Sequence, residues 1–309
     1  MKYIKKNKRY IVLFLIFFIL FFSVVLKKIG KVSINELLFG SSLKKVERHI
    51  DRVSKLGYKI NVTYLLYNGN KKDVELTKNT FIKTLIRLDG LSDENKHFFY
   101  RDKLSLKINQ LGLTFEEKME NLIEILEFAR DRNIMVWISS HKKKDSQTEF
   151  SVYKNLRKKG YDNVGITLAA YHNSFLSKVQ EVLDMGGITR VVKGYYKDGE
   201  IQDWNLVTQN YYQGARLLFL SGTNHQIAGH DFDNIIVPLH KEFNLNENTN
   251  MEFGFFLNSI GYVEKQLQEN NITLRNKYAL ITFGKIYRYL KSNIKDISFK
   301  RSIKAKAFL

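Results

Sequence analysis

The sequence predicts an α/β protein built as a (β/α)8 barrel. Eight short apolar segments rich in β-branched residues begin at intervals of 24 to 46 residues between positions 58 and 283. Amphipathic helical patterns lie between them, an alternation typical of a parallel sheet closed into a barrel. The alternative is an open doubly wound sheet, but the Gly-rich phosphate loop that usually follows its first strand is missing after Leu66.

The predicted strands are near-continuously apolar, as expected of strands buried on both faces. They are Tyr58–Leu66, Leu104–Ile108, Ile134–Ser140, Val164–Tyr171, Thr189–Tyr196, Gln226–Asp231, Asn250–Phe256 and Tyr278–Phe283. Helices are expected at Ser41–Leu56, Leu76–Leu88, Thr114–Arg132, Phe175–Met185, Phe232–Phe243, Ser259–Gln268 and Ile286–Ile294. The clearest helix begins with Thr114 and Glu117, the two positions of a capping box. No linker-like stretch interrupts residues 39–296, so we expect one barrel domain.

The N-terminal segment predicts a membrane anchor. Residues 10–26 read YIVLFLIFFILFFSVVL and carry no charge. As a helix they span about 25 Å, within the usual range for a bilayer core, and they are apolar on every face. A cleaved signal peptide is the alternative, but no small-x-small cleavage site follows. We therefore expect residues 1–32 to form a basic N-terminus with a single transmembrane helix, and residues 33–309 to form the barrel with a basic C-terminal tail.

Composition and charge exclude several classes of protein. The chain of 309 residues has 50 basic and 31 acidic residues, a net charge of +19, and no cysteine. Disulfides, thiolate metal sites and cysteine nucleophiles are therefore excluded. Many of the basic residues flank the apolar segment or lie in the C-terminal tail, and no zinc finger, RNP sequence or Arg-rich arm accompanies them. Attraction to a membrane surface explains this charge better than nucleic-acid binding.

Polar residues near the carboxyl ends of the predicted strands form the candidate site. In a (β/α)8 barrel these ends surround the functional opening, which we call the mouth. Lys107 lies on the second predicted strand, and Arg190 and Lys193 lie on the fifth. A cationic mouth suits phosphate groups or an electron-rich ring rather than a divalent metal. Lys107 and Lys193 are also candidates for Schiff-base chemistry, whereas a strand-end histidine such as His230 is more often structural.

Six segments together resemble the proline dehydrogenases, a family of FAD-dependent (β/α)8 barrels. They are LSLKINQLGL (104–113), VGITLAAY (164–171), RVVKGYY (190–196), IAGHD (227–231), MEFGFF (251–256) and FGKIYRYL (283–290), and they occur in the family's order. The resemblance covers about residues 39–296. It implies non-covalent FAD and the oxidation of proline, or a related secondary amine, to its imine by hydride transfer, with electrons passed to a membrane quinone.

The resemblance also implies roles for individual residues. Lys107 would be the catalytic residue at the substrate end of the flavin. The implied cofactor-binding positions are Arg190, Lys193, His230 and Ala169. The implied substrate-binding positions are Tyr195, Tyr196, Tyr278, Tyr289 and Arg288. Tyr278 stands two residues before Leu280, which occupies the position of the family's strand-8 tyrosine. We take Glu252 to be structural.

The chain departs from the family pattern at several of these positions. The arginine pair that binds the substrate carboxylate is replaced by Ser292 and Asn293, and the strand-3 aspartate by Ser139. The strand-4 glutamine is Ala169, and the threonine before the histidine is Gly229. Two alternatives therefore stay open: an FAD enzyme for a different amine, and a membrane-tethered barrel that binds without catalysis. The basic residues around the apolar segment slightly favour an external domain, whereas an FAD enzyme usually faces the cytoplasm, which we prefer.

Overall fold

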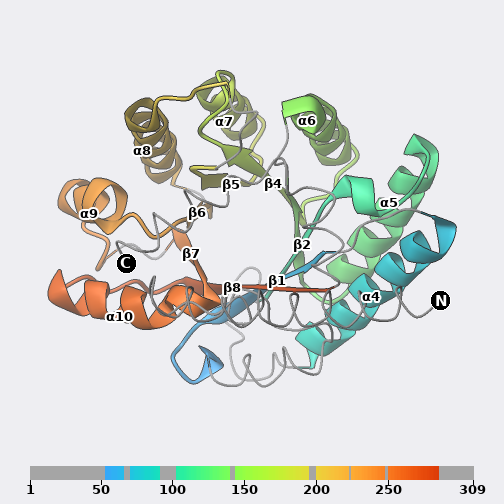
Figure 1. Cartoon of the computed structure of the whole chain (residues 1–309), viewed down its shortest axis with the longest axis horizontal. Helices are drawn as coiled ribbons and strands as arrows, with labels where there is room; N and C mark the ends of the chain where they lie inside the picture. Colours follow the sequence, from blue (N-terminus) through green and yellow to red (C-terminus); the bar gives the residue numbers. More distant parts are fainter. Residues whose placement is uncertain are drawn as a thin grey trace, which may run out of the picture.

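Eight parallel strands form a closed barrel. The computed structural model describes residues 53–65, 70–90, 102–139, 143–194, 200–222, 224–247 and 250–284. Within these residues each strand pairs with the next along the chain, and β8 pairs with β1 to close the sheet. The helices lie around the outside of the barrel (Figure 1). The predicted (β/α)8 barrel is confirmed.

The strands match the predicted segments within a few residues at each end. They are β1 Lys59–Leu65, β2 Lys103–Leu106, β3 Met135–Ser139, β4 Val164–Ala169, β5 Thr189–Val192, β6 Gln226–Ala228, β7 Glu252–Phe256 and β8 Lys277–Gly284. Strands β4, β5 and β6 end earlier than predicted. The chain after β5 turns at Gly194, which has a positive φ of 74°.

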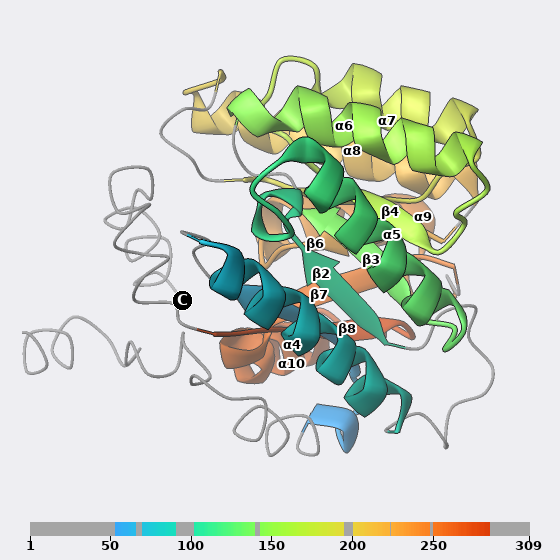
Figure 2. The same cartoon turned by 90° about the vertical axis from the view of Figure 1, so that its right-hand side faces the viewer.

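The helices occupy most of the intervals between strands. They are α4 Lys71–Asp89, α5 Phe115–Arg130, α6 Lys143–Lys158, α7 Phe175–Asp184, α8 Trp204–Ser221, α9 Val237–Phe243 and α10 Ile260–Glu269. Three short helices, η1 Ile108–Gln110, η2 Phe232–Ile236 and η3 Leu257–Ser259, follow β2, β6 and β7. Figure 2 shows α4 to α7 packed side by side against the strands. The predicted helices at 41–56 and 286–294 lie mostly or wholly outside the described residues.

Two helices, α6 and α8, were not predicted. Helix α6 is polar except for a stripe in which Phe150, Tyr153 and Leu156 are buried. Helix α8 contains Gly214, which usually weakens a helix. Here a β-carbon at Gly214 would lie 2.5 Å from the ring of Phe175 on α7, so the glycine allows the two helices to pack closely.

The two faces of the sheet have opposite character. On β1, Ile60, Val62 and Tyr64 face the helices and belong to the hydrophobic core. The alternate residues face the inside of the barrel, which we call the lumen. Buried polar side chains occupy several of the lumen-facing positions on neighbouring strands. Gly165 makes room there for the indole of Trp137, whose ring atoms would lie 2.5 Å from a β-carbon at that position.

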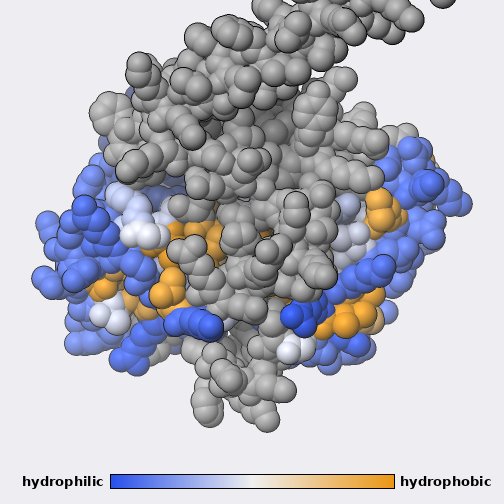
Figure 3. Space-filling model, turned by 60° about the horizontal axis from the view of Figure 1, so that its bottom comes forward, coloured by the Kyte–Doolittle hydropathy of each residue, from blue (hydrophilic) through white to orange (hydrophobic). Residues whose placement is uncertain are grey.

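The predicted membrane anchor at residues 10–26 lies outside the described residues, as do the boundary at residue 32 and the basic tail. Among the helices of the described part of the chain, none has the length and apolar character needed to cross a membrane. On the face seen in Figure 3, the described surface is mostly hydrophilic, with smaller hydrophobic areas.

Candidate active site

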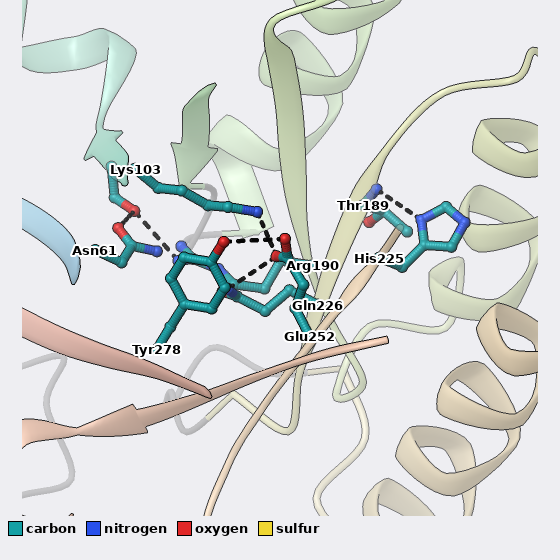
Figure 4. A network of polar contacts seen from close by, with 9 residues as sticks. Asn61, Lys103, Thr189, Arg190, His225, Gln226, Glu252 and Tyr278 are labelled. Atoms are coloured by element: carbon teal, nitrogen blue, oxygen red, sulfur yellow. Dashed lines mark hydrogen bonds and ion pairs between the residues drawn. The ribbon is translucent and has the colours of Figure 1, made fainter. Parts of the chain in front are cut away.

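Arg190 lies in the lumen (Figure 4). Hydroxyl groups from three strands hold its guanidinium group. Its Nε donates a hydrogen bond to Thr167 Oγ1 at 3.0 Å, Nη1 donates to Ser105 Oγ at 3.2 Å, and Nη2 donates to Ser139 Oγ at 3.0 Å. The side chain is almost fully buried, with 6% of its surface exposed. Burial lowers the pKa of Arg190 to about 9, against the opposing effect of the Glu252 charge. The guanidinium is therefore still protonated at neutral pH.

A second buried network lies beside Arg190 and centres on Glu252 (Figure 4). The carboxylate of Glu252 forms a buried ion pair with Lys103 Nζ. Its Oε1 accepts a hydrogen bond from the Tyr278 hydroxyl at 3.2 Å, and its Oε2 accepts a long one from Gln226 Nε2 at 3.4 Å. Burial lowers the pKa of Lys103, and the charge of Glu252 raises it. This ion pair neutralises Lys103 inside the barrel, in agreement with a structural role for Glu252.

Tyr278 belongs to this network and not to the mouth. It is the second residue of β8 and lies in register with Lys59, the first residue of β1. Its side chain is fully buried, and Lys103 Nζ lies 4.7 Å from its ring centroid. Two residues along a strand correspond to about 6.6 Å, so the offset from Leu280 moves the side chain down the lumen toward the amino ends of the strands. The structure thus places Tyr278 deep in the lumen beside Lys103 and Glu252. Its role in substrate binding stays a prediction.

Lys193 follows β5 at the mouth and is anchored to the neighbouring segments. Its Nζ pairs with the carboxylate of Asp231, which follows β6. The same ammonium donates a hydrogen bond to Thr208 Oγ1 at 2.9 Å and lies 4.8 Å from the ring centroid of Trp204, both on α8. Lys193 therefore stands between the ends of two strands and the beginning of α8, with its ammonium paired to Asp231.

His230 is stacked against Phe256 at the end of β7. Its Nε2 accepts a hydrogen bond from the Phe256 backbone N–H at 3.0 Å, so a neutral imidazole carries its proton on Nδ1. The two rings are 5.3 Å apart with an interplanar angle of 19°, and Phe256 is 49% exposed. The contact fixes the plane of the imidazole and leaves an apolar ring beside it on the surface.

The positions where the sequence departs from the family pattern are tightly packed. Ala169 is buried at the end of β4 and offers only a methyl group. A β-carbon on Gly194 would lie 3.0 Å from the Ala169 Cβ and would overlap the ring of Tyr171. At Gly229 a β-carbon would lie 3.1 Å from the hydroxyl of Tyr211. A tyrosine from α8 thus takes the space that a side chain at position 229 would need.

Lys107 stands at the mouth on the lumen side of β2. The strand ends at Leu106, one residue before it, but Lys107 keeps an extended backbone with φ −113° and ψ 126°. The strand alternation therefore continues through Lys103, Ser105 and Lys107, which share one face. Since the side chains of Lys103 and Ser105 lie in the lumen, Lys107 belongs to the same row one step nearer the opening.

Four predicted site residues, Tyr195, Tyr196, Arg288 and Tyr289, lie outside the described residues. Of the others, the structure brings Arg190 to the lumen and Lys193 and His230 to the ends of β5 and β6. Sequence reasoning missed Lys103 and the hydroxyl groups around Arg190. The alternation in KLSLK, residues 103–107, is a signal that could have placed the polar residues together in the lumen. Among the described residues, no group of three or more histidine, aspartate or glutamate side chains could hold a metal ion.

Known proteins resemble this chain in sequence. Proline dehydrogenase 2 of Bacillus subtilis (strain 168) is 26% identical over 207 residues, which are 65% of this chain and 66% of that protein. The chain is similar to the proline dehydrogenases. Proline dehydrogenase 1 of the same strain is 21% identical over 200 residues, covering 63% of this chain and 64% of that protein. The aligned region is just under two thirds of these relatives' length. No protein-family model matches the chain.

Solved structures share the fold. The crystal structure of proline utilization A (PutA) from Bdellovibrio bacteriovorus, inactivated by N-propargylglycine, superposes with a TM-score of 0.72 at 14% identity, covering 84% of this chain and 32% of that one. PutA from Bradyrhizobium japonicum gives a TM-score of 0.62 at 17% identity, covering 75% and 27% of the two chains. Sequence and fold therefore agree, and the predicted resemblance to proline dehydrogenases is confirmed.

Proposed function

We propose that this chain is an FAD-dependent oxidoreductase that oxidises proline, or a related secondary amine, to its imine. The observation that carries the proposal is the buried, charged Arg190 in the lumen of a barrel whose sequence is similar to proline dehydrogenases. When bound, FAD accepts the hydride removed from the amine. Cations near the site where negative charge develops stabilise that charge, most strongly where water is excluded.

The donor set of the mouth fits a flavin nucleotide. Arg190 offers a buried positive charge for the ring system, and Lys193 offers an ammonium for the phosphates. The exposed rings of Phe256 and Trp204 offer apolar surface for the flat parts of the cofactor. Ala169 contributes packing without a side-chain hydrogen bond. We therefore assign cofactor binding to Arg190, Lys193 and His230, with Ala169 in contact.

In this proposal the substrate binds at the mouth of the barrel, through side chains of this chain. Lys107 supplies a cation at the mouth, and we propose it as the catalytic residue. Tyr195, Tyr196, Tyr289 and Arg288 complete the substrate pocket in this proposal. With Ser292 and Asn293 in place of an arginine pair, a bidentate carboxylate clamp is missing. Secondary amines without a carboxylate therefore belong among the substrates to be tested.

The partners of the reaction follow from the same proposal. We infer that residues 10–26 anchor the chain in a membrane with the barrel on the cytoplasmic face, so that electrons pass to a membrane quinone. The uncharged apolar segment and the basic residues on either side of it support the membrane anchor. The cytoplasmic side follows from the proposed FAD enzyme and not from these charges, which slightly favour the opposite orientation. Nucleic acid is not among the proposed partners.

The test is the flavin spectrum of the full chain purified in detergent. We expect an FAD absorption band that bleaches when proline is added without oxygen. Replacing Lys193 with methionine should lower flavin retention at least tenfold, because a cation next to the phosphates is lost. The matched control is Lys159→Met, since Lys159 is exposed beyond the end of α6. A wild-type chain that neither contains FAD nor takes it up would refute the proposal.

A second candidate function is a membrane-tethered barrel that binds a ligand without catalysis. The loss of the arginine pair at positions 292 and 293 favours it. A bound flavin that no cyclic or secondary amine reduces would select this candidate over the enzyme.

A further inference from the structure

We propose that three lumen hydroxyl groups hold the guanidinium of Arg190 in place without neutralising it, so that its charge is kept for a negative group arriving at the mouth. The three positioning residues are Ser105, Ser139 and Thr167. The inference rests on the proposed function, because there the arriving negative charge is the one that develops on the flavin ring.

The geometry fixes the guanidinium at three different nitrogens. Nε, Nη1 and Nη2 each donate to one hydroxyl, and the three acceptors come from β4, β2 and β3. Ser105 donates its own proton to Asn61 Oδ1 at 2.8 Å, so its lone pairs are directed to Arg190. A planar group bonded at three corners by three strands of one sheet cannot rotate about its last bond without breaking these contacts.

The charge of Arg190 has no counter-ion in contact with it among the described residues. The lumen carboxylate of Glu252 forms its ion pair with Lys103 and acts on Arg190 only from a distance. The ring centroid of Trp137 lies 5.3 Å from the Arg190 guanidinium carbon. Burial without a matching charge disfavours the protonated form, and the pKa of Arg190 falls to about 9 for this reason. A neutral hydroxyl satisfies a hydrogen bond but leaves the positive charge in place.

Negative charge near the guanidinium of Arg190 is stabilised for two reasons. The attraction acts in a lumen of low dielectric constant, and no internal carboxylate has to be displaced first. The reduced flavin carries more negative charge than the oxidised one. The arrangement should therefore raise the midpoint potential of a bound flavin relative to a barrel in which Arg190 is internally paired.

The test compares two side chains of equal size at position 139, one charged and one neutral. Ser139→Asp gives Arg190 a counter-ion, and Ser139→Asn is the neutral control of the same size. Two quantities are measured for both variants in the full chain: the melting temperature without flavin, and the midpoint potential with flavin bound. We expect the aspartate variant to melt at a higher temperature and to bind a flavin of lower potential than the asparagine variant.

Each outcome decides the inference. An aspartate variant no more stable than the asparagine variant would mean that Arg190 is already neutralised, and equal potentials would mean that the flavin does not sense its charge; either result overturns the inference. A wild-type chain without flavin overturns the proposed function together with this inference, and it is recognised before any substitution is made. If Ser139→Asp does not fold, Ser105→Asp compared with Ser105→Asn makes the same test.

Discussion

The ion pair between Lys103 and Glu252 places two opposite charges where water does not reach. Replacing Glu252 with glutamine leaves the ammonium buried without its partner, and Tyr278 loses a charged acceptor. We expect a loss of about 3–5 kcal/mol in the free energy of unfolding, measured by urea denaturation. The double variant Lys103→Met with Glu252→Leu should recover most of this loss, because it removes both charges. If the free energy of unfolding of the Glu252→Gln variant lies within about 0.5 kcal/mol of wild type, the ion pair does not stabilise the fold as we expect.

His225 makes the stability of the barrel sensitive to acid. Its Nδ1 accepts a hydrogen bond from the Thr189 backbone N–H at 3.2 Å, and the side chain is fully buried. Burial, together with the charge of Lys103, lowers the pKa of His225 from 6.5 to about 4. Between these two values the unfolded chain binds more protons than the folded one, so the free energy of unfolding should fall as the pH drops from about 6.5 to 4.

The His225→Asn variant is the matched comparison for this effect. Its Oδ1 can accept the Thr189 hydrogen bond, but it does not titrate. Thermal melts at a series of pH values should show a smaller slope for the variant than for wild type between pH 6.5 and 4. Equal slopes would mean that other groups control the acid sensitivity.

At the scale of residues, the sequence alone identifies the cations of the mouth but not their partners. Arg190 and Lys193 are recognisable because they lie in RVVKGYY, a segment that resembles the proline dehydrogenases. The pairing of Lys103 with Glu252 joins residues 149 positions apart. It depends on the stagger of neighbouring strands in the closed barrel, and local patterns do not carry that information.

At the scale of elements, the start of α5 shows a cap that the sequence predicted. Thr114 Oγ1 accepts from the Glu117 N–H at 3.2 Å, while Glu117 Oε2 accepts from the Leu113 N–H at 2.7 Å. The side chain of Glu117 thus accepts its hydrogen bond from Leu113, the residue before the cap, and not from Thr114. Thr114→Ala should cost about 1 kcal/mol of unfolding free energy in urea melts. Ser174→Ala is the control, since Ser174 begins α7 without a side-chain cap bond, and an equal loss there would contradict the explanation.

The turn after β5 depends on a glycine for two separate reasons. Gly194 has φ of 74°, and a β-carbon there would overlap the ring of Tyr171. Gly186 has φ of 61° but has no atom within 4 Å of a β-carbon. Gly186→Ala should therefore cost only about 1 kcal/mol for the left-handed backbone, and Gly194→Ala should cost clearly more. Melting temperatures of the two variants compare the steric effect directly; similar values would show that Tyr171 moves aside freely.

The elements that the sequence failed to predict also have a physical explanation. Helix α6 is rich in polar residues, and two of its buried residues, Ser146 and Glu149, are polar themselves, so the apolar helical period is weak. Gly214 in α8 counts against a helix when the chain is considered alone. Its advantage, close packing on Phe175, exists only in the folded molecule.

At the scale of the whole molecule, eight regularly spaced apolar strands, six of them followed by a predicted helix, were enough to predict the barrel, because that pattern is local. The apolar strand sequences did not reveal how polar the lumen is. Each strand has an apolar face toward the helices and a lumen face whose polarity differs from strand to strand. The lumen became visible only when the register of all eight strands was known.

Closure of the barrel through β1 and β8 sets the order of events during synthesis. Seven residue pairs join these strands, from Lys59 with Tyr278 to Leu65 with Gly284. About 200 residues separate the two strands along the chain. At the usual rates of translation, β1 waits about 10 to 45 s for its partner to be made. Its hydrogen-bonding edge toward β8 is open throughout that time, which makes the newly made chain a client for chaperones until β8 is in place.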